Sequence, residues 1–175
     1  FWVMELPDRQ ALLDELVRLD ARELLYPADQ SAELGAWLDG LRGARLQAQP
    51  GLSFDLEDAR RRLLDQFAVL SLDGFGCQGL TTAIQAAGAI LLYLKDTQPG
   101  ASLGHLRRLQ VRHRADEMHL DSATLRNLEL TRPLSGDRSD ATLFSVLDRT
   151  VTSMGRRLLR DWITRPLVQL APLQA

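Results

Sequence analysis

The chain has 175 residues, of which 45% are hydrophobic, enough for one globular domain and an appendage. Its formal net charge of -2 excludes the strongly basic balance of a chain that binds nucleic acid over its whole surface. A lone cysteine, Cys77, excludes an internal disulfide and agrees with a reducing cytoplasm.

The chain opens in an apolar stretch, residues 1–6, that has neither an initiator methionine at its start nor a charged leader. We therefore expect a strand entered partway along, in a chain that is a piece of a larger protein. The longest apolar run, residues 86–94, is too short to cross a bilayer and contains Gly88, so no membrane partner is expected.

Strand-like and helix-like segments alternate over the first hundred residues. We expect strands at 1–6, 22–26 and 44–49, the last at a sheet edge. Helices are predicted from Pro7-Asp8 to Leu19, from about Gln30 to Asp39, and from 56 to 67 after the cap residue Asp55. Apolar residues repeat at helical spacing in the first helix (Leu12, Leu13, Leu16, Val17 and Leu19), and the second should carry Leu34, Trp37 and Leu38 inward. Such alternation predicts an α/β fold in layers, with a mixed sheet flanked by helices.

A long helix is predicted at about residues 80–96, after an apolar run at 68–72 and a glycine-rich turn at 73–79. Beyond its first turn this helix is apolar most of the way round, so it should be largely buried. The polar positions cluster at its start: Gln78, Thr81, Thr82 and Gln85.

The second half of the chain is predicted to be helical with little strand. Residues 103–111 are expected to form a connection with some helix, and 118–120 a short strand-like piece. Asp121 or Ser122 should cap a short helix to Leu128, before a polar loop at 134–140. Two further helices are expected at 142–148 and 153–164, the last capped by Thr152 and stopped by Pro166. The apolar stripe of the last helix consists of Met154, Leu158, Leu159 and Trp162.

The glycine-rich turn contains a formal dinucleotide-binding pattern, Gly74, Gly76 and Gly79. Such glycines let a backbone and a helix N-terminus approach a pyrophosphate. The acidic partner, Asp96, should end a second strand, but the helical pattern runs unbroken through Lys95. A tight turn before a buried helix needs the same glycines, so we favour a structural role. An NAD-like nucleotide site stays open as the alternative.

Other catalytic patterns are weak. His105, His113 and His119 have irregular spacing, which favours structural histidines over metal ligands. Cys77 beside a helix start could be a low-pKa thiolate, although a small residue in a turn is favoured. A nuclease would need acidic residues grouped on neighbouring strands, where only Glu5 is expected. We therefore expect no enzyme activity and no bound cofactor or metal in this chain.

Two arginine clusters lie on predicted helices, each opposite an apolar stripe, as solvated helix faces do. The clusters are Arg60, Arg61 and Arg62, and Arg156, Arg157, Arg160 and Arg165. A weaker alternative is sequence-independent contact with DNA phosphates through Arg156 and Arg160.

Two segments near the end carry a family resemblance. Residues 120–130 contain Asp121, Thr124, Asn127, Leu128 and Glu129 in the pattern D-x-x-T-x-x-N-L-E-L. Residues 145–167 match the pattern L-D-x-T-x-T-x-M-G-x-R-x-L with Leu147, Asp148, Thr150, Thr152, Met154, Gly155, Arg157 and Leu159. Together with R-E-L-L-Y at 22–26, L-D-G-F-G at 72–76 and A-A-G-A-I-L-L-Y-L-K-D-T-Q at 86–98, they resemble bacterial MutS mismatch repair proteins.

The resemblance implies a connector domain at 1–103 with an RNase H-like fold but no nuclease activity. It further implies a transition segment at 104–135 and the first helices of the core or lever domain at 136–175. The parent would be a cytoplasmic, nucleoid-associated homodimer that clamps mismatched double-stranded DNA, binds ATP and Mg in other domains, and signals to MutL. The connector would link the mismatch-binding and ATPase domains.

In such a connector, the helix after the glycine turn belongs to a surface implicated in MutL docking. Carried over to this chain, that surface would include Gln78, Thr81, Thr82 and Gln85. The resemblance also implies that the stripe of Met154, Leu158 and Trp162 lacks most of its packing partners. These residues should therefore be exposed, folded back, or buried against a second copy.

Overall fold

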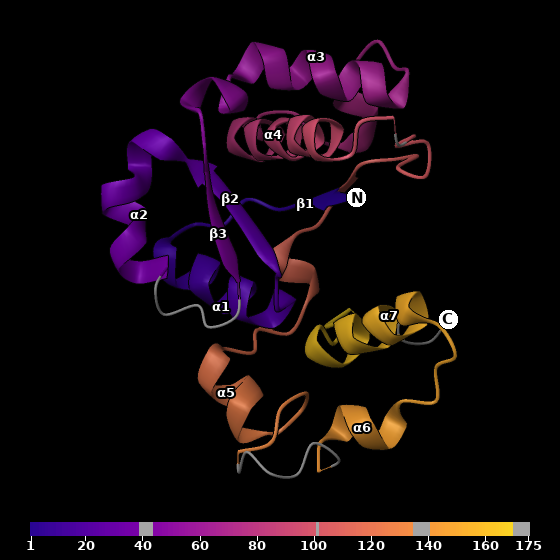
Figure 1. The fold of residues 1–175 in the computed structure, drawn as a ribbon. Coiled ribbons are helices and arrows are strands. Elements are labelled where there is room, and N and C mark those ends of the chain that lie inside the picture. The colour runs from indigo at the N-terminus through magenta and orange to yellow at the C-terminus, as the bar shows by residue number, and fades with distance from the viewer. Residues whose placement is uncertain (39–43, 101, 135–140, 170–175) are drawn as a thin grey trace. The chain divides into compact units, whose positions relative to one another are not determined.

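A computed structural model describes residues 1–38, 44–100, 102–134 and 141–169, with backbone only at 35–38 (Figure 1). The chain forms two compact units. Unit 1 comprises Phe1–Glu5 and Ala21–Arg112, and unit 2 comprises Leu6–Asp20 and His113–Ala175. No helix in the described part of the chain is long and apolar enough to cross a membrane.

The described strands of unit 1 form two short parallel pairs. Strand β1 (Trp2–Val3) pairs with β4 (Gln110–Val111), and β2 (Glu23–Pro27) pairs with β3 (Arg45–Gln49). Figure 1 shows β2 and β3 side by side. The predicted second and third strands are confirmed, the first is shorter than predicted, and the helix expected within 103–111 is wrong. The pairing with β1 makes residues 110 and 111 a strand, and so short a strand leaves no period in the sequence.

The helix α2 (Ser31–Leu38) follows a short 3-10 turn at Ala28–Gln30. It confirms the predicted helix, whose last residue, Asp39, lies outside the described part of the chain. The side chains of Trp37 and Leu38, expected to point inward, also lie outside it.

Helices α3 (Leu56–Phe67) and α4 (Thr81–Thr97) lie along each other and form the core of unit 1 (Figure 1). Asp55 caps α3 as predicted, because its carboxylate accepts a hydrogen bond from the Asp58 N–H at 2.9 Å. The helices meet so closely at Gly88 that a Cβ there would lie 2.3 Å from Ala59 Cβ. Other buried members of this core are Val3, Leu63, Leu72, Cys77, Ala83, Ile84, Ala87, Leu91, Leu103 and Leu109.

Part of the surface of α4 departs from the prediction of a largely buried helix. Ala86 and Ile90 are exposed, whereas Ala83, Ala87, Ala89 and Leu91 are buried. Gly88 serves close packing against α3. The apolar run at 68–72 forms no strand, and Leu70 within it is fully exposed.

The described part of unit 2 contains four α-helices, and a side chain caps the start of each. They are α1 (Arg9–Leu19), α5 (Ser122–Asn127), α6 (Leu143–Leu147) and α7 (Ser153–Thr164), and their caps are Asp8, Asp121, Thr142 and Thr152. These positions confirm the predicted helices. Residues 135–140 of the predicted polar loop lie outside the described part. The strand-like piece expected at 118–120 is wrong, and only the residue before it, Glu117, forms an antiparallel bridge, with Leu167.

Helix α1 contributes mainly polar side chains to the interior of unit 2. The buried residues of α1 are Ala11, Asp14, Glu15 and Arg18, whereas Val17 and Leu19 are exposed. A helix with such an apolar repeat ordinarily turns its polar residues to solvent. Here Asp14 accepts hydrogen bonds from Gln10 Nε2 and the Ser122 N–H, so the buried polar face has specific partners.

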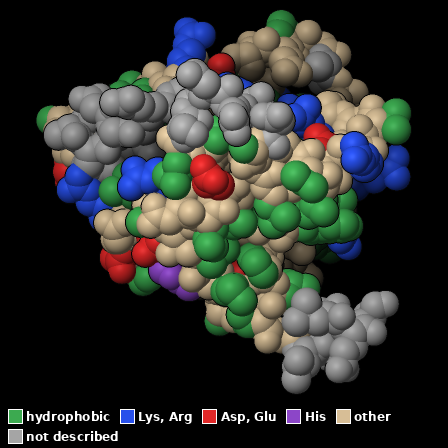
Figure 2. Space-filling view, turned by 90° about the horizontal axis from the view of Figure 1, so that it is seen from below, with side chains coloured by type: hydrophobic (Ala, Val, Ile, Leu, Met, Phe, Trp, Pro, Cys, Tyr) green, Lys and Arg blue, Asp and Glu red, His purple; other side chains and the backbone are tan. Residues whose placement is uncertain are grey.

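Many large hydrophobic side chains of unit 2 lie on its surface, and Figure 2 shows hydrophobic side chains gathered in clusters on one face of the molecule. The exposed ones on and beside α6 and α7 are Leu143, Val146, Leu147, Val151, Met154, Leu158, Trp162, Leu167 and Val168. Met154 is 78% exposed and Trp162 65%. The stripe of the last helix is therefore exposed in the single chain and does not fold back, as one of the expected arrangements had it.

Candidate functional site

The polar start of α4 forms one candidate surface. Gln78, Thr81 and Thr82 are exposed there, and Gln85 is half-buried one turn further on. No side chain of the residue preceding the helix caps it, but the Glu5 carboxylate accepts a hydrogen bond from the Ala83 N–H at 3.1 Å. The helix start is therefore fixed by a residue far away in sequence. Glu5 lies beyond the end of β1, so the strand placement expected for it is wrong.

A hollow of about 250 Å³ lies beside this surface. Its walls include Gln78 and Gly79 together with Arg60 and Leu70. Since Leu70 is fully exposed, an apolar anchor and a polar rim lie next to each other.

The glycine turn has a structural explanation. Gly76 and Gly79 have φ angles of 75° and 76°, which only glycine adopts readily, whereas a Cβ at Gly74 or Gly79 would meet nothing within 4 Å. A dinucleotide fingerprint needs a preceding strand and close packing at its last glycine, and the turn has neither. Asp96 lies within α4. These residues do not fit a dinucleotide cofactor.

Cys77 is also structural. It is 2% exposed within the core, and burial raises the pKa of its thiol. The alternative of a low-pKa thiolate is therefore wrong, because desolvation is the cause that governs this group. Among the described residues, His, Cys, Asp and Glu side chains nowhere gather in a group of three or more suited to a metal ion.

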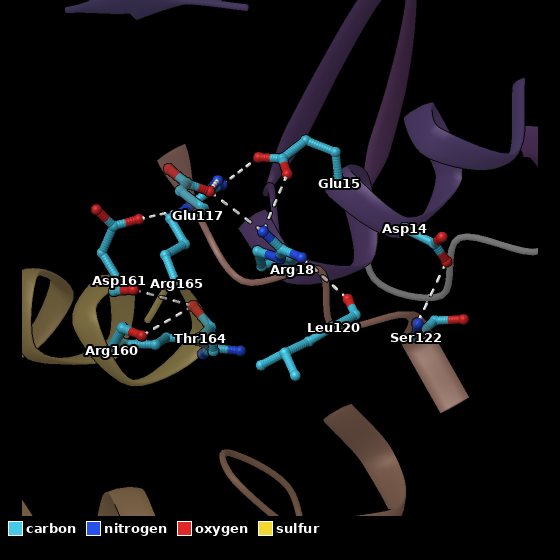
Figure 3. A network of polar contacts seen from close by, with 10 residues as sticks. All are labelled: Asp14, Glu15, Arg18, Glu117, Leu120, Ser122, Arg160, Asp161, Thr164 and Arg165. Carbon is cyan, nitrogen blue, oxygen red and sulfur yellow. Dashed lines mark hydrogen bonds and ion pairs between the residues drawn. The ribbon is translucent and has the colours of Figure 1, made fainter. Parts of the chain in front are cut away.

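The second candidate site is an ionic cluster in unit 2, made of Glu15, Arg18, Glu117, Asp161 and Arg165 (Figure 3). Arg165, at the C-terminal end of α7, donates to Glu15 of α1, to Glu117 at 2.9 Å and to Asp161 at 2.7 Å. Arg18 of α1 donates to the same Glu117 oxygen at 3.3 Å and to the Leu120 carbonyl at 2.9 Å. Both arginine side chains are at least 94% buried.

The pKa values of Arg18 and Arg165 shift in opposite directions. Burial lowers the pKa of Arg18 and the charge of Arg165 lowers it further, against the attraction of Glu15 and Glu117. Burial also acts to lower the pKa of Arg165, but the hydrogen bond and charge of Glu15, helped by Glu117, outweigh it and raise the pKa. Arg165 donates hydrogen bonds to three carboxylates, so the cluster centres on it.

The ionic cluster was missed by sequence reasoning, which assigned Arg165 to a solvated basic face. One local signal existed, the spacing of Glu15 and Arg18 three residues apart on a helix. Their partners Glu117 and Arg165 lie about a hundred residues further on or more, and nothing in the sequence connects them.

The arginines considered for DNA contact are engaged within unit 2. Arg156 pairs with Asp148 at 3.1 Å and lies over the Phe144 ring, and Arg160 pairs with Asp20 at 3.0 Å. These ion pairs compete with phosphate. The structure does not gather Arg156 and Arg160 around one site.

The two sequence patterns near the C-terminus build helix caps. The Asp121 carboxylate accepts a hydrogen bond from the Thr124 N–H at 2.6 Å. The Thr152 hydroxyl accepts one from the Gly155 N–H at 3.0 Å, so close that a Cβ at Gly155 would crowd that oxygen. The hydrogen bonds to Asp121 and, from Thr150, to Asp148 lower the pKa of both carboxyl groups. The patterns thus mark local structure.

The described fold is of the mixed helix and strand class, with short parallel sheets and a helical second unit. The family model of MutS domain II matches residues 1–107, and the family model of MutS domain III matches residues 123–175. The chain therefore belongs to the MutS family of DNA mismatch repair proteins.

The ionic cluster spans the two matched domains. Glu15 and Arg18 lie in the domain II match, Asp161 and Arg165 in the domain III match, and Glu117 in the segment between them. Helix α1 belongs to domain II by sequence but to unit 2 by its contacts.

Proposed function

We propose that this chain is the connector region of a MutS mismatch repair protein, with an RNase H-like first domain that performs no catalysis. It would link the mismatch-binding and ATPase domains of a parent that binds ATP and Mg elsewhere. That parent would be a cytoplasmic, nucleoid-associated homodimer on mismatched double-stranded DNA. The family match supports this role.

The observation that carries the proposal is the bonding of α1 to the end of α7 by the ionic cluster. A connector has to pass a change in one domain to the next, and coupling requires contacts that both domains share. Glu15 and Arg18 are held by Glu117 and Arg165, so α1 moves with the segment matched to domain III. The chain joins α1 directly to both segments of unit 1.

The polar start of α4 is the proposed docking face for MutL. Its exposed residues are Gln78, Thr81 and Thr82, and Gln78 lines a hollow that also has the fully exposed Leu70 on its wall. An apolar anchor with a polar rim is the usual layout of a protein–protein interface. Gln85 is only half-buried and can contribute at the edge.

The test is a binding titration of this chain with the N-terminal domain of its cognate MutL. Thr82→Lys should weaken saturable binding about tenfold or more, since it places a charge in the centre of the face. Thr97→Lys makes the same change at the exposed far end of α4 and should leave binding unchanged. Absence of saturable binding to a folded sample, or equal weakening by both variants, would overturn the docking proposal.

A further inference from the structure

Unit 2 contains a cavity of about 320 Å³ with an unusual wall composition. Among the described residues that line it, four are arginines: Arg18 of α1, Arg126 of α5, Arg132, which follows α5 in the chain, and Arg160 of α7. None of these described lining residues is acidic. Figure 3 shows two of these arginines with Ser122 and Thr164, which also line the cavity.

Two of the arginines have an unmet hydrogen-bonding group. The Nε atoms of Arg18 and Arg160 are buried and have no hydrogen-bond partner among the described residues. The Arg18 side chain as a whole is 94% buried, so its Nε–H is not satisfied by bulk water. A buried unsatisfied donor is costly, more so on a charged group, and such a group calls for an acceptor.

The carboxylates near the cavity do not neutralise its walls. Arg132 and Arg160 share one carboxylate, that of Asp20. Arg126 is exposed and has no ion pair with any residue in the described part of the chain.

Nor do the acids behind Arg18 add a surplus of negative charge. Glu15, Glu117 and Asp161 are divided between Arg18 and Arg165, and Arg114 adds a further positive charge near Arg18. Asp14 lies behind Ser122 and does not line the cavity. The charged side chains on the described walls are therefore all positive.

We propose that this cavity binds a phosphate group, as a monoester or a diester. Guanidinium groups recognise phosphate oxygens by paired N–H donors, and a tetrahedral phosphate accepts from several directions at once. Arginines from α1, α5 and α7 converge on the cavity from different elements, which suits a phosphate better than a planar carboxylate. The volume is about ten times the share of one water in the liquid, so a phosphate with an attached group fits.

Asp20 acts as the internal competitor of that phosphate. Its carboxylate holds Arg132 and Arg160, and its backbone is in the left-handed region at φ 49°. Asparagine tolerates that conformation well, so Asp20→Asn removes the competing charge without straining the chain. Release of two arginines should strengthen phosphate binding.

The test is calorimetric titration of the chain with inorganic phosphate, with pyrophosphate, and with a short DNA duplex, at constant ionic strength against chloride. Arg126→Ala should weaken phosphate binding about tenfold, since one charged hydrogen-bonding group is lost. Asp20→Asn should tighten it about threefold or more. Arg157→Ala, an exposed arginine elsewhere on unit 2, should leave it unchanged.

Two results would overturn the proposal: no phosphate binding beyond chloride, or equal weakening by Arg126→Ala and Arg157→Ala, which indicates diffuse charge attraction. The other arms identify the source of the phosphate. Duplex binding that is lost in Arg126→Ala and displaced by inorganic phosphate assigns a nucleic-acid diester. Binding of inorganic phosphate or pyrophosphate without duplex binding assigns a small phosphorylated molecule.

Discussion

The two units of this chain differ in the polar side chains that they bury, although unit 2 also buries Ala11, Leu120, Leu125 and Phe144. Unit 1 buries hydrophobic residues between α3 and α4, and the one buried polar residue among its described side chains is Ser53. Unit 2 buries Asp14, Glu15, Arg18, Thr142, Thr164 and Arg165, while many of its large hydrophobic residues are exposed.

This difference determines what fixes the structure of each unit. Apolar burial has no direction and is limited mainly by packing volume, whereas buried charges need particular partners at particular distances. Unit 1 should therefore fail when volume is added, and unit 2 when one charge is removed.

The largest expected effect is in unit 2. Arg165→Ala leaves Glu15 and Glu117 buried without their main cation and should lower the free energy of unfolding by about 3–5 kcal/mol. Urea unfolding followed by circular dichroism measures the loss, and hydrogen exchange should locate it in α1 and α7. Arg157→Ala on the same helix should change stability by no more than about 0.5 kcal/mol. Equal small effects would show that the ionic cluster contributes nothing.

The next effect is in unit 1. Gly88→Ala puts a Cβ 2.3 Å from Ala59 Cβ and 2.4 Å from Ala59 Cα, so the two helices must separate. A loss of about 2–3 kcal/mol is expected, despite the better helix propensity of alanine. Gly74→Ala is the matched control, because its Cβ meets nothing within 4 Å. Thermal unfolding measures both losses. An equal loss of stability in the two variants would mean that α3 and α4 are not closely packed in solution.

The smallest effect concerns the pH dependence of the unit 1 core. Burial raises the pKa of the Cys77 thiol, so on raising the pH the unfolded chain loses this proton first. The free energy of unfolding should be unaffected by Cys77 below about pH 8.5 and should fall at higher pH. Cys77→Ala should remove that component of the fall. Thiol labelling should also be slow until urea unfolds the chain, and fast labelling of the folded chain would contradict the burial of Cys77.

The elements that sequence predicted well are those fixed by neighbouring residues. Asp55, Asp121 and Thr152 cap their helices through N–H groups three residues away, and such spacing is visible in any sequence. The long helix α4 was also predictable, because its apolar composition extends over many turns.

What sequence missed depends on distant partners. Strand β4 exists because Gln110 and Val111 pair with residues at the other end of unit 1. The buried polar face of α1 is explained by distant partners, among them Glu117, Ser122 and Arg165. Periodicity reports which side of a helix is apolar, but it does not report what the polar side meets. Three candidate docking residues, Gln78, Thr81 and Thr82, are exposed at or just before the start of α4, and Gln85 is half-buried. The ionic cluster and the arginine-lined cavity could not be found from sequence.

The position of α1 has a practical consequence for dissecting the protein. A truncated chain that stops at residue 107, where the domain II match ends, would keep α1 but lose Glu117 and Arg165. Its Glu15 and Arg18 would then have only each other, 3.8 Å apart, on a helix exposed to solvent. Such a piece should express poorly or aggregate for reasons unrelated to its own core. A usable version of unit 1 would omit residues 6–20 and join Glu5 to Ala21 by a short linker. Its boundaries would then be those of the compact unit and not those of the family match.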